Sequence, residues 1–172
     1  MKRLMAMALT LASLPLHAAT YYLTVAGLGG EPEYEKDFTS WAQDIDKRLR
    51  EADSSAQIVT LYGAKANLAH VELMLDQFAR QAKADDLLAV FLIGHGSFDG
   101  EQYKVNLPGP DITAVDLAEW MNRVPARRQL VVDMTSASGA AVAALERPDR
   151  AVIAATKSGS EKNLTVFPRY WV

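Results

Sequence analysis

Residues 87–93 read Leu-Leu-Ala-Val-Phe-Leu-Ile and are followed directly by Gly94, His95 and Gly96. Seven apolar residues without a charge are typical of a strand that is buried on both faces. Strands of this kind lie inside parallel sheets that are covered by helices on both sides. The run therefore predicts an α/β protein, and it places His95 just beyond the carboxyl end of a central strand.

Strands and helices alternate on both sides of this run. Strand patterns occupy residues 21–26, 57–62, 87–93, 130–132 and 151–156. Helical spacing of apolar residues occupies residues 37–52, 67–82, 116–124 and 138–145. Residues 99–113 interrupt the alternation with the turn signal Asp99-Gly100, which predicts a small β excursion at the carboxyl edge of the sheet. The order predicts a three-layer αβα sandwich with a mostly parallel sheet.

The first 19 residues predict a secretory signal peptide. Two basic residues precede an apolar run over residues 4–16, and the small residues Ala18 and Ala19 follow. The run is too short for an ordinary membrane span. We therefore expect cleavage near Ala18 or Ala19, a domain from residue 20 to 172, and a secreted or periplasmic protein.

Composition excludes several classes of function. The 172 residues are 49% hydrophobic and 23% charged, which is ordinary for one globular domain. The net charge of −3 argues against nucleic-acid binding. There are no cysteines, which removes disulfides and thiolate chemistry, and three histidines are too few for a histidine-rich metal centre. No metal and no cofactor is implied.

Polar residues follow two of the predicted strands. Gly94-His95-Gly96 follows one strand, and Asp133-Met134-Thr135-Ser136-Ala137-Ser138-Gly139 follows the next. The carboxyl ends of parallel strands meet at one edge, so we expect these motifs to lie close together. A hydroxyl at a strand-to-helix turn lies near backbone amides, which suits a nucleophile or an oxyanion hole. A structural interpretation stays open, in which Ser136 or Ser138 is a helix cap.

Together the two motifs resemble those of the caspase-like peptidases and the legumains. Gly94-His95-Gly96 matches the histidine motif, and Ser136-Ala137-Ser138-Gly139 matches the nucleophile motif, with serine in place of cysteine. The order of elements is also similar, from Tyr21 to about Glu161. The resemblance implies that His95 and Ser136 form a pair that hydrolyses peptide bonds, with the amides of Gly96 and Ser136 as the oxyanion hole.

The serine is a departure with chemical consequences. A thiol, with a pKa of about 8.5, needs only a histidine to become a nucleophile, whereas a serine hydroxyl normally needs a histidine that a carboxylate orients. Asp99 and Asp133 are the nearby carboxylates, and Thr135 is an alternative hydroxyl. Three interpretations of Ser136 stay open: a working nucleophile, the mark of a degenerate peptidase that still binds peptide, or an engineered replacement.

Two functions follow from these alternatives. One is hydrolysis of a peptide or related amide, and the other is a catalytically silent module that binds a peptide or protein. Residues 158–161 follow the last strand at the same edge and are candidates to line a substrate groove. Either function implies a peptide or protein partner, no nucleic acid and no membrane span in the mature chain, and leaves the oligomeric state open.

The end of the chain carries an apolar helical pattern formed by Val166, Phe167, Tyr170 and Trp171. Either this segment packs on the sheet, or it begins a helix of a longer protein. We expect the second, with the domain continuing beyond Val172.

Overall fold

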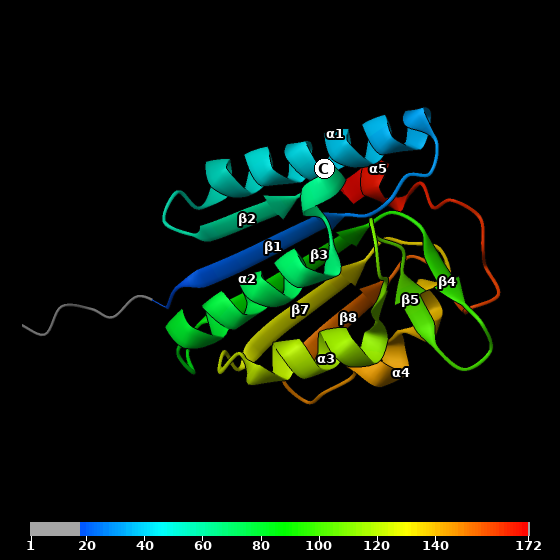
Figure 1. Cartoon of the computed structure of the whole chain (residues 1–172). Helices are drawn as coiled ribbons and strands as arrows, with labels where there is room; N and C mark the ends of the chain where they lie inside the picture. Colours follow the sequence, from blue (N-terminus) through cyan, green and yellow to red (C-terminus); the bar gives the residue numbers. More distant parts are fainter. Residues whose placement is uncertain (1–17, 172) are drawn as a thin grey trace, which may run out of the picture.

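The computed structural model describes residues 18–171, and its centre is a five-stranded parallel sheet (Figure 1). The strands are β1 (Thr20–Ala26), β2 (Gln57–Leu61), β3 (Leu87–Ile93), β7 (Arg128–Asp133) and β8 (Arg150–Ala154). They lie in the order β2-β1-β3-β7-β8, and every neighbouring pair is parallel. The signal peptide predicted over residues 1–19 lies outside the described residues, except for Ala18 and Ala19.

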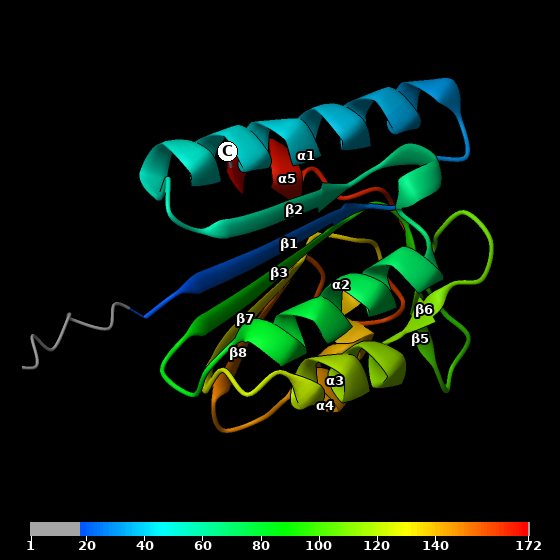
Figure 2. The same cartoon turned by 60° about the vertical axis from the view of Figure 1, so that its left-hand side comes forward.

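Helices cover both faces of the sheet (Figures 1 and 2). One face carries α1 (Pro32–Ala52) and α5 (Phe167–Trp171), and the other carries α2 (Leu68–Gln81), α3 (Ala114–Arg123) and α4 (Val142–Leu145). A hydrophobic core lies on each face of the sheet, and β3 contributes side chains to both. Its residues Leu88, Val90 and Leu92 face α2 and α3, whereas Ala89, Phe91 and Ile93 face α1. The predicted three-layer αβα sandwich is confirmed.

The direction of the connections reverses between β1 and β3. The chain leaves β1 through α1 toward β2, and it returns through α2 to β3 on the other side of β1. Right-handed crossovers then place α1 and α2 on opposite faces. The crevice at such a reversal often binds ligands. Here the loop that follows β1 is in direct contact with the loop at Asn106, because the amide of Leu28 donates to the carbonyl of Asn106 (2.9 Å), and a Cβ on Gly27 would meet the same oxygen at 2.5 Å.

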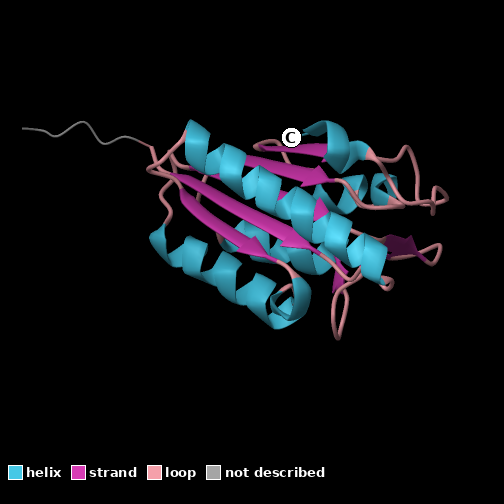
Figure 3. Cartoon of the chain, turned by 90° about the horizontal axis from the view of Figure 1, so that it is seen from above, coloured by secondary structure: helices cyan, strands magenta, loops and turns pink. Residues whose placement is uncertain are grey.

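The β excursion predicted over residues 99–113 is a separate antiparallel sheet. Its strands are β4 (Gly96–Phe98), β5 (Tyr103–Val105) and β6 (Ile112–Thr113). It lies beyond the carboxyl end of the central sheet (Figure 3). Thr113 and Asp116 form a reciprocal capping box that begins α3 directly after β6.

Two helix predictions need correction. α1 begins at Pro32, five residues before the expected start, because proline fits the first helical position and Glu33 and Glu35 favour a helix N-terminus. The helix expected over residues 138–145 is a short 3₁₀ turn, η2 (Ser138–Ala140), followed by the single turn α4. A second 3₁₀ turn, η1 (Gly63–Lys65), precedes α2.

The C-terminal segment packs on the sheet, as one of its two interpretations expected, and the continuation of the domain beyond Val172 stays a prediction. Phe167 joins the core beneath α1, and the ring of Trp171 lies 6.2 Å from that of Phe91 between centroids. Val172 lies outside the described residues. Within residues 18–171, no helix combines the length and the apolar character that crossing a membrane requires.

Candidate functional site

The structure brings the histidine motif and the serine motif into contact. A Cβ at Gly96 would lie 2.3 Å from the carbonyl oxygen of Ser136 and 2.6 Å from the hydroxyl oxygen of Thr135. Gly96 begins β4, whereas Thr135 and Ser136 follow β7, the neighbour of β3 in the sheet. The shared carboxyl edge therefore places the two motifs side by side.

Two backbone amides at this contact donate to no acceptor among residues 18–171. Asn106 donates to the carbonyl of His95, and Asp99 donates to that of Gln102. Antiparallel ladders alternate, so Gly96, which stands opposite Val105, has its N–H directed away from β5. Within residues 18–171, the amide of Ser136 also donates to no acceptor. These are the two groups that the resemblance assigned to the oxyanion hole.

The imidazole of His95 packs against helix α1. It packs edge-on against Tyr34 and Phe38 of α1, with ring centroids 5.4 and 5.2 Å apart. No side chain in the described part of the chain forms a hydrogen bond with the ring, neither Ser136 nor a carboxylate. The two catalytic candidates thus come from adjacent strand ends but do not form a bonded pair.

Asp99, the first candidate to orient the histidine, forms no hydrogen bond with His95 in the described part of the chain. Its carboxylate accepts hydrogen bonds from the backbone amides of Gln102 (2.8 Å) and Glu101 (3.0 Å), and Lys104 lies 3.7 Å away. The same two amides lower the pKa of Asp99. The side chain is exposed and shapes the turn between β4 and β5.

Asp133 and Thr135 belong to a buried hydrogen-bonded chain with Tyr103 of β5. One carboxylate oxygen of Asp133 accepts from the amide (3.1 Å) and the hydroxyl (2.8 Å) of Thr135. The Thr135 hydroxyl also lies 2.5 Å from the hydroxyl of Tyr103. Asp133 therefore does not reach His95, and the hydroxyl of Thr135 is no free nucleophile.

Burial determines the electrostatics of this group. It raises the pKa of Asp133 to about 6, although the hydroxyls of Tyr103 and Thr135 favour the ionised form. Burial, together with the charge of Asp133, also raises the pKa of Tyr103 well above its ordinary value. The second carboxylate oxygen of Asp133 has no partner among the described residues.

The two serines of the motif differ sharply. Ser136 is 1% exposed, and its hydroxyl forms no hydrogen bond within the described chain. The hydroxyl of Ser138 accepts from the amide of Thr156 (3.1 Å) and lies 3.3 Å from the Thr156 hydroxyl. Neither serine is the cap of η2, because that position is occupied by Ala137, which has a left-handed conformation with φ of 55°.

We name residues 134–137, between β7 and η2, the serine turn. Residues 155–166, which we name the crossing segment, run from β8 over the serine turn to α5. The amide of Ala137 donates to the carbonyl of Glu161 (2.8 Å), and the hydroxyl of Thr165 donates to the carbonyl of Met134. The serine turn is therefore bonded to this segment through its backbone. Sequence reasoning missed Thr165, although the apolar pattern just after it was visible.

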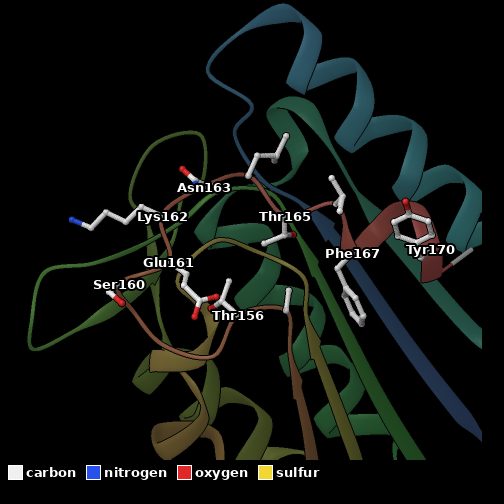
Figure 4. Close-up of a pocket in the computed structure, with 11 residues that line it drawn as sticks. Thr156, Ser160, Glu161, Lys162, Asn163, Thr165, Phe167 and Tyr170 are labelled. Atoms are coloured by element: carbon white, nitrogen blue, oxygen red, sulfur yellow. The ribbon is translucent and has the colours of Figure 1, made fainter.

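An open pocket of about 710 Å³ lies along the crossing segment and α5 (Figure 4). Thr156, Glu161 and Thr165 line it from the crossing segment, and Phe167 and Tyr170 line it from α5. Of the residues proposed as a substrate groove, Ser160 and Glu161 do line this pocket. Within residues 18–171, no group of three histidine or acidic side chains is arranged to hold a metal ion.

Comparison with known proteins shows the fold alone. No protein-family model and no curated protein matches this chain. It is similar to a Geobacter sulfurreducens protein solved by structural genomics, with a TM-score of 0.55 and 15% identity over 78% of this chain and 57% of that one. It is also similar to Raptor from Chaetomium thermophilum, with a TM-score of 0.53 and 12% identity over 74% of this chain and 12% of that one.

Neither of these two proteins is named as a caspase-like peptidase. The resemblance to that family therefore rests on the two sequence motifs and their contact in the structure. This chain also spans only part of both neighbours, and at these identities the likeness extends to the α/β fold and no further.

Proposed function

We propose that this chain is an exported, catalytically silent relative of the caspase-like peptidases, and that it binds an extended peptide or protein segment. The observation that carries the proposal is the state of Ser136. Its hydroxyl is 1% exposed and has no partner within the described residues, while His95 packs against Tyr34 and Phe38. A serine becomes nucleophilic only when a base accepts its proton.

A serine mechanism also needs a carboxylate bonded to the histidine, and within residues 18–171 no carboxylate forms that bond. Asp99 is bonded to the amides of its own turn, and Asp133 is bonded to Thr135. Rotation of His95 alone would therefore not complete a triad. The two motifs are in contact, but among the described residues no hydrogen bond joins His95 to Ser136, which supports the silent interpretation.

The binding half of the proposal is supported by the edge of the sheet. β8 pairs with β7 alone among the described strands, so its outer edge leaves backbone groups available. Such edges accept an added strand from a peptide or a partner. On the α5 side of β8, Ile153 is 37% exposed, and the neighbouring pocket exposes Val166 (55%) and Tyr170 (76%). We infer a ligand that is extended and carries apolar side chains.

A second function, hydrolysis of an amide, is favoured by the unpaired amides of Gly96 and Ser136. Two such donors are the arrangement that stabilises an oxyanion. In this alternative Ser136 attacks the carbonyl, His95 transfers the serine proton to the leaving amine, and the two amides bind the oxyanion. Water, deprotonated by His95, then cleaves the resulting ester, which releases the acid and restores the Ser136 hydroxyl. This alternative requires the serine turn to open and the His95 ring to turn away from α1.

Selection with a phage-displayed library of random peptides tests the binding function on the purified mature protein. We expect selected peptides to bind the wild type and Ser136→Ala with equal affinity. Ile153→Asp is expected to weaken them at least about tenfold, and Leu28→Asp, an exposed leucine away from β8, to leave them unchanged. The proposal would be contradicted if the selected peptides bound Ile153→Asp as tightly as the wild type, or if no peptides were selected.

Labelling with a fluorophosphonate separates the two functions. A stoichiometric adduct on Ser136 that disappears in His95→Ala would establish an activated serine and overturn the silent interpretation. An unlabelled serine, together with peptides that survive incubation uncut, is the result that the proposed function expects.

A further inference from the structure

The start of β1 is held by a buried carboxylate. Asp86, in the turn before β3, is 5% exposed. One of its oxygens accepts the N–H of Ala19 (2.8 Å), and the other accepts the N–H of Lys83 (2.7 Å). The carbonyl of Ala19 in turn accepts the N–H of Leu87 (3.0 Å). Ala19 is thus bonded to the sheet through both of its backbone groups.

The sequence offers two cleavage positions here, one after Ala18 and one after Ala19. A cut after Ala19 would discard both of its hydrogen bonds. It would also leave an oxygen of the buried Asp86 carboxylate without its donor, which is costly. A cut after Ala18 keeps Ala19 in place. The same nitrogen then carries a positive charge opposite a carboxylate, and charged hydrogen bonds of this kind are stronger than neutral ones.

We propose that signal peptidase hydrolyses the bond between Ala18 and Ala19, and that the new α-ammonium of Ala19 forms an ion pair with Asp86. This inference rests on the proposed export of the chain. Water adds to the carbonyl carbon of Ala18, the C–N bond to Ala19 breaks, and the leader leaves with the new carboxylate of Ala18. The nitrogen of Ala19 takes up a proton and remains 2.8 Å from Asp86.

The surroundings provide room for this charge. A small pocket of about 210 Å³ is lined by Ala18, Ala19, Tyr21, Lys83 and Asp86, among others. The charged and titratable side chains around the amine are Lys83, Asp85, Asp86 and Tyr21, and Arg128 donates to the carbonyl of Asp85 (2.8 Å). Asp86 is the only carboxylate of this group that bonds to the nitrogen of Ala19 in the described chain.

Sequencing the N-terminus of the protein exported with its own leader tests the cleavage position. We expect the mature chain to begin Ala-Thr-Tyr-Tyr. A chain that begins at Thr20 overturns this inference and leaves the proposed export intact. A chain that keeps Met1 in the cell overturns the export itself, so the two failures are distinguishable.

A second measurement tests the ion pair independently of export. A recombinant chain that begins at Ala19 is compared with one that carries two additional residues, Gly-Ser, before Ala19. We expect NMR titration to place the pKa of the free α-amino group at least about one unit above its ordinary value of about 7.7–8.0. In Asp86→Asn we expect it to return to that range.

The ion pair with Asp86 should also make the chain that begins at Ala19 differ in stability from the chain extended by Gly-Ser. The free α-ammonium has a raised pKa in the folded chain, so its stabilising effect is complete below about pH 7.7 and is lost as the pH rises through the folded value. We therefore expect the chain beginning at Ala19 to be the more stable at pH 7 and the two to converge near pH 10. An ordinary pKa in the wild type overturns the ion pair, even if Asp86→Asn fails to fold.

Discussion

The Cα of Gly96 lies so close to the carbonyl of Ser136 that a Cβ at position 96 would come within 2.3 Å of that oxygen. The atom nearest to such a Cβ belongs to the backbone, so it cannot move aside as the end of a flexible side chain could. The glycine after His95 is therefore required by the packing of β4 against the serine turn, whether or not the site catalyses a reaction. A Gly-His-Gly motif at a strand end is compatible with a silent protein for this reason.

Gly96→Ala should destabilise the fold by about 2 kcal/mol or more, because the serine turn must move to admit a methyl group. Ser97→Ala, at the exposed next residue of β4, should change stability by less than about 0.5 kcal/mol. Urea denaturation of both variants measures the difference. Equal stabilities would show that the contact at Gly96 relaxes without cost.

Ser136→Ala and Ser138→Ala should change stability in opposite directions, although both serines are buried. The first variant removes a buried hydroxyl that has no partner among the described residues, and we expect a gain of about 1 kcal/mol. The second leaves the amide of Thr156 without its acceptor, and we expect a loss of about 1–2 kcal/mol. Thermal and urea unfolding give the signs, and a loss in Ser136→Ala would reveal a bond that this hydroxyl makes in solution.

Asp133→Asn should abolish a pH dependence of stability between about pH 4 and pH 6. Burial raises the pKa of Asp133 from 3.8 to about 6, so the folded chain holds this proton where the unfolded chain has released it. The contribution of protonated Asp133 to the stability of the folded chain is complete below pH 3.8, and it is lost as the pH rises through about 6. The stability of Asp133→Asn relative to the wild type should then rise by roughly 3 kcal/mol between pH 3.8 and pH 7. Urea midpoints across this range measure it, and a constant difference would mean that Asp133 titrates normally.

The fold could be predicted from local patterns because each pattern reports burial. The run over residues 87–93 supplies alternate side chains to both cores, and a strand without a polar face can only be central. The edge on which the motifs meet followed from the parallel order. The early start of α1 at Pro32 was missed because its first turn carries charges and little apolar signal.

The side-chain partners at the site could not be predicted, because they come from distant parts of the chain. Thr135 is bonded to Tyr103, which is 32 residues away on the second sheet. The same hydroxyl of Thr135 donates to Asp133, so the carboxylate is held within this hydrogen-bonded chain. His95 follows Gly94, whose φ of 141° accompanies a close approach to Gly27 of another strand end. Sequence proximity suggested Asp99 as a partner, but its carboxylate is satisfied within its own turn.

Phe167→Ala should loosen the crossing segment over the serine turn. Phe167 packs in the core beneath α1, and the hydroxyl of Thr165 reaches Met134 from the residues just before it. Losing that packing should let the carbonyl of Glu161 leave the amide of Ala137 more often, so hydrogen exchange of this amide should accelerate by about tenfold or more.

Two controls separate local loosening from general destabilisation. Tyr170→Ala removes an aromatic ring of the same helix that is 76% exposed, and it should leave the exchange of the Ala137 amide unchanged. The amide of Val90, inside β3, should keep its rate in both variants unless the whole fold is affected. If Phe167→Ala accelerates Val90 as much as Ala137, α5 stabilises the entire sheet. If it accelerates neither, the crossing segment is held by its own hydrogen bonds, and access to Ser136 does not depend on α5.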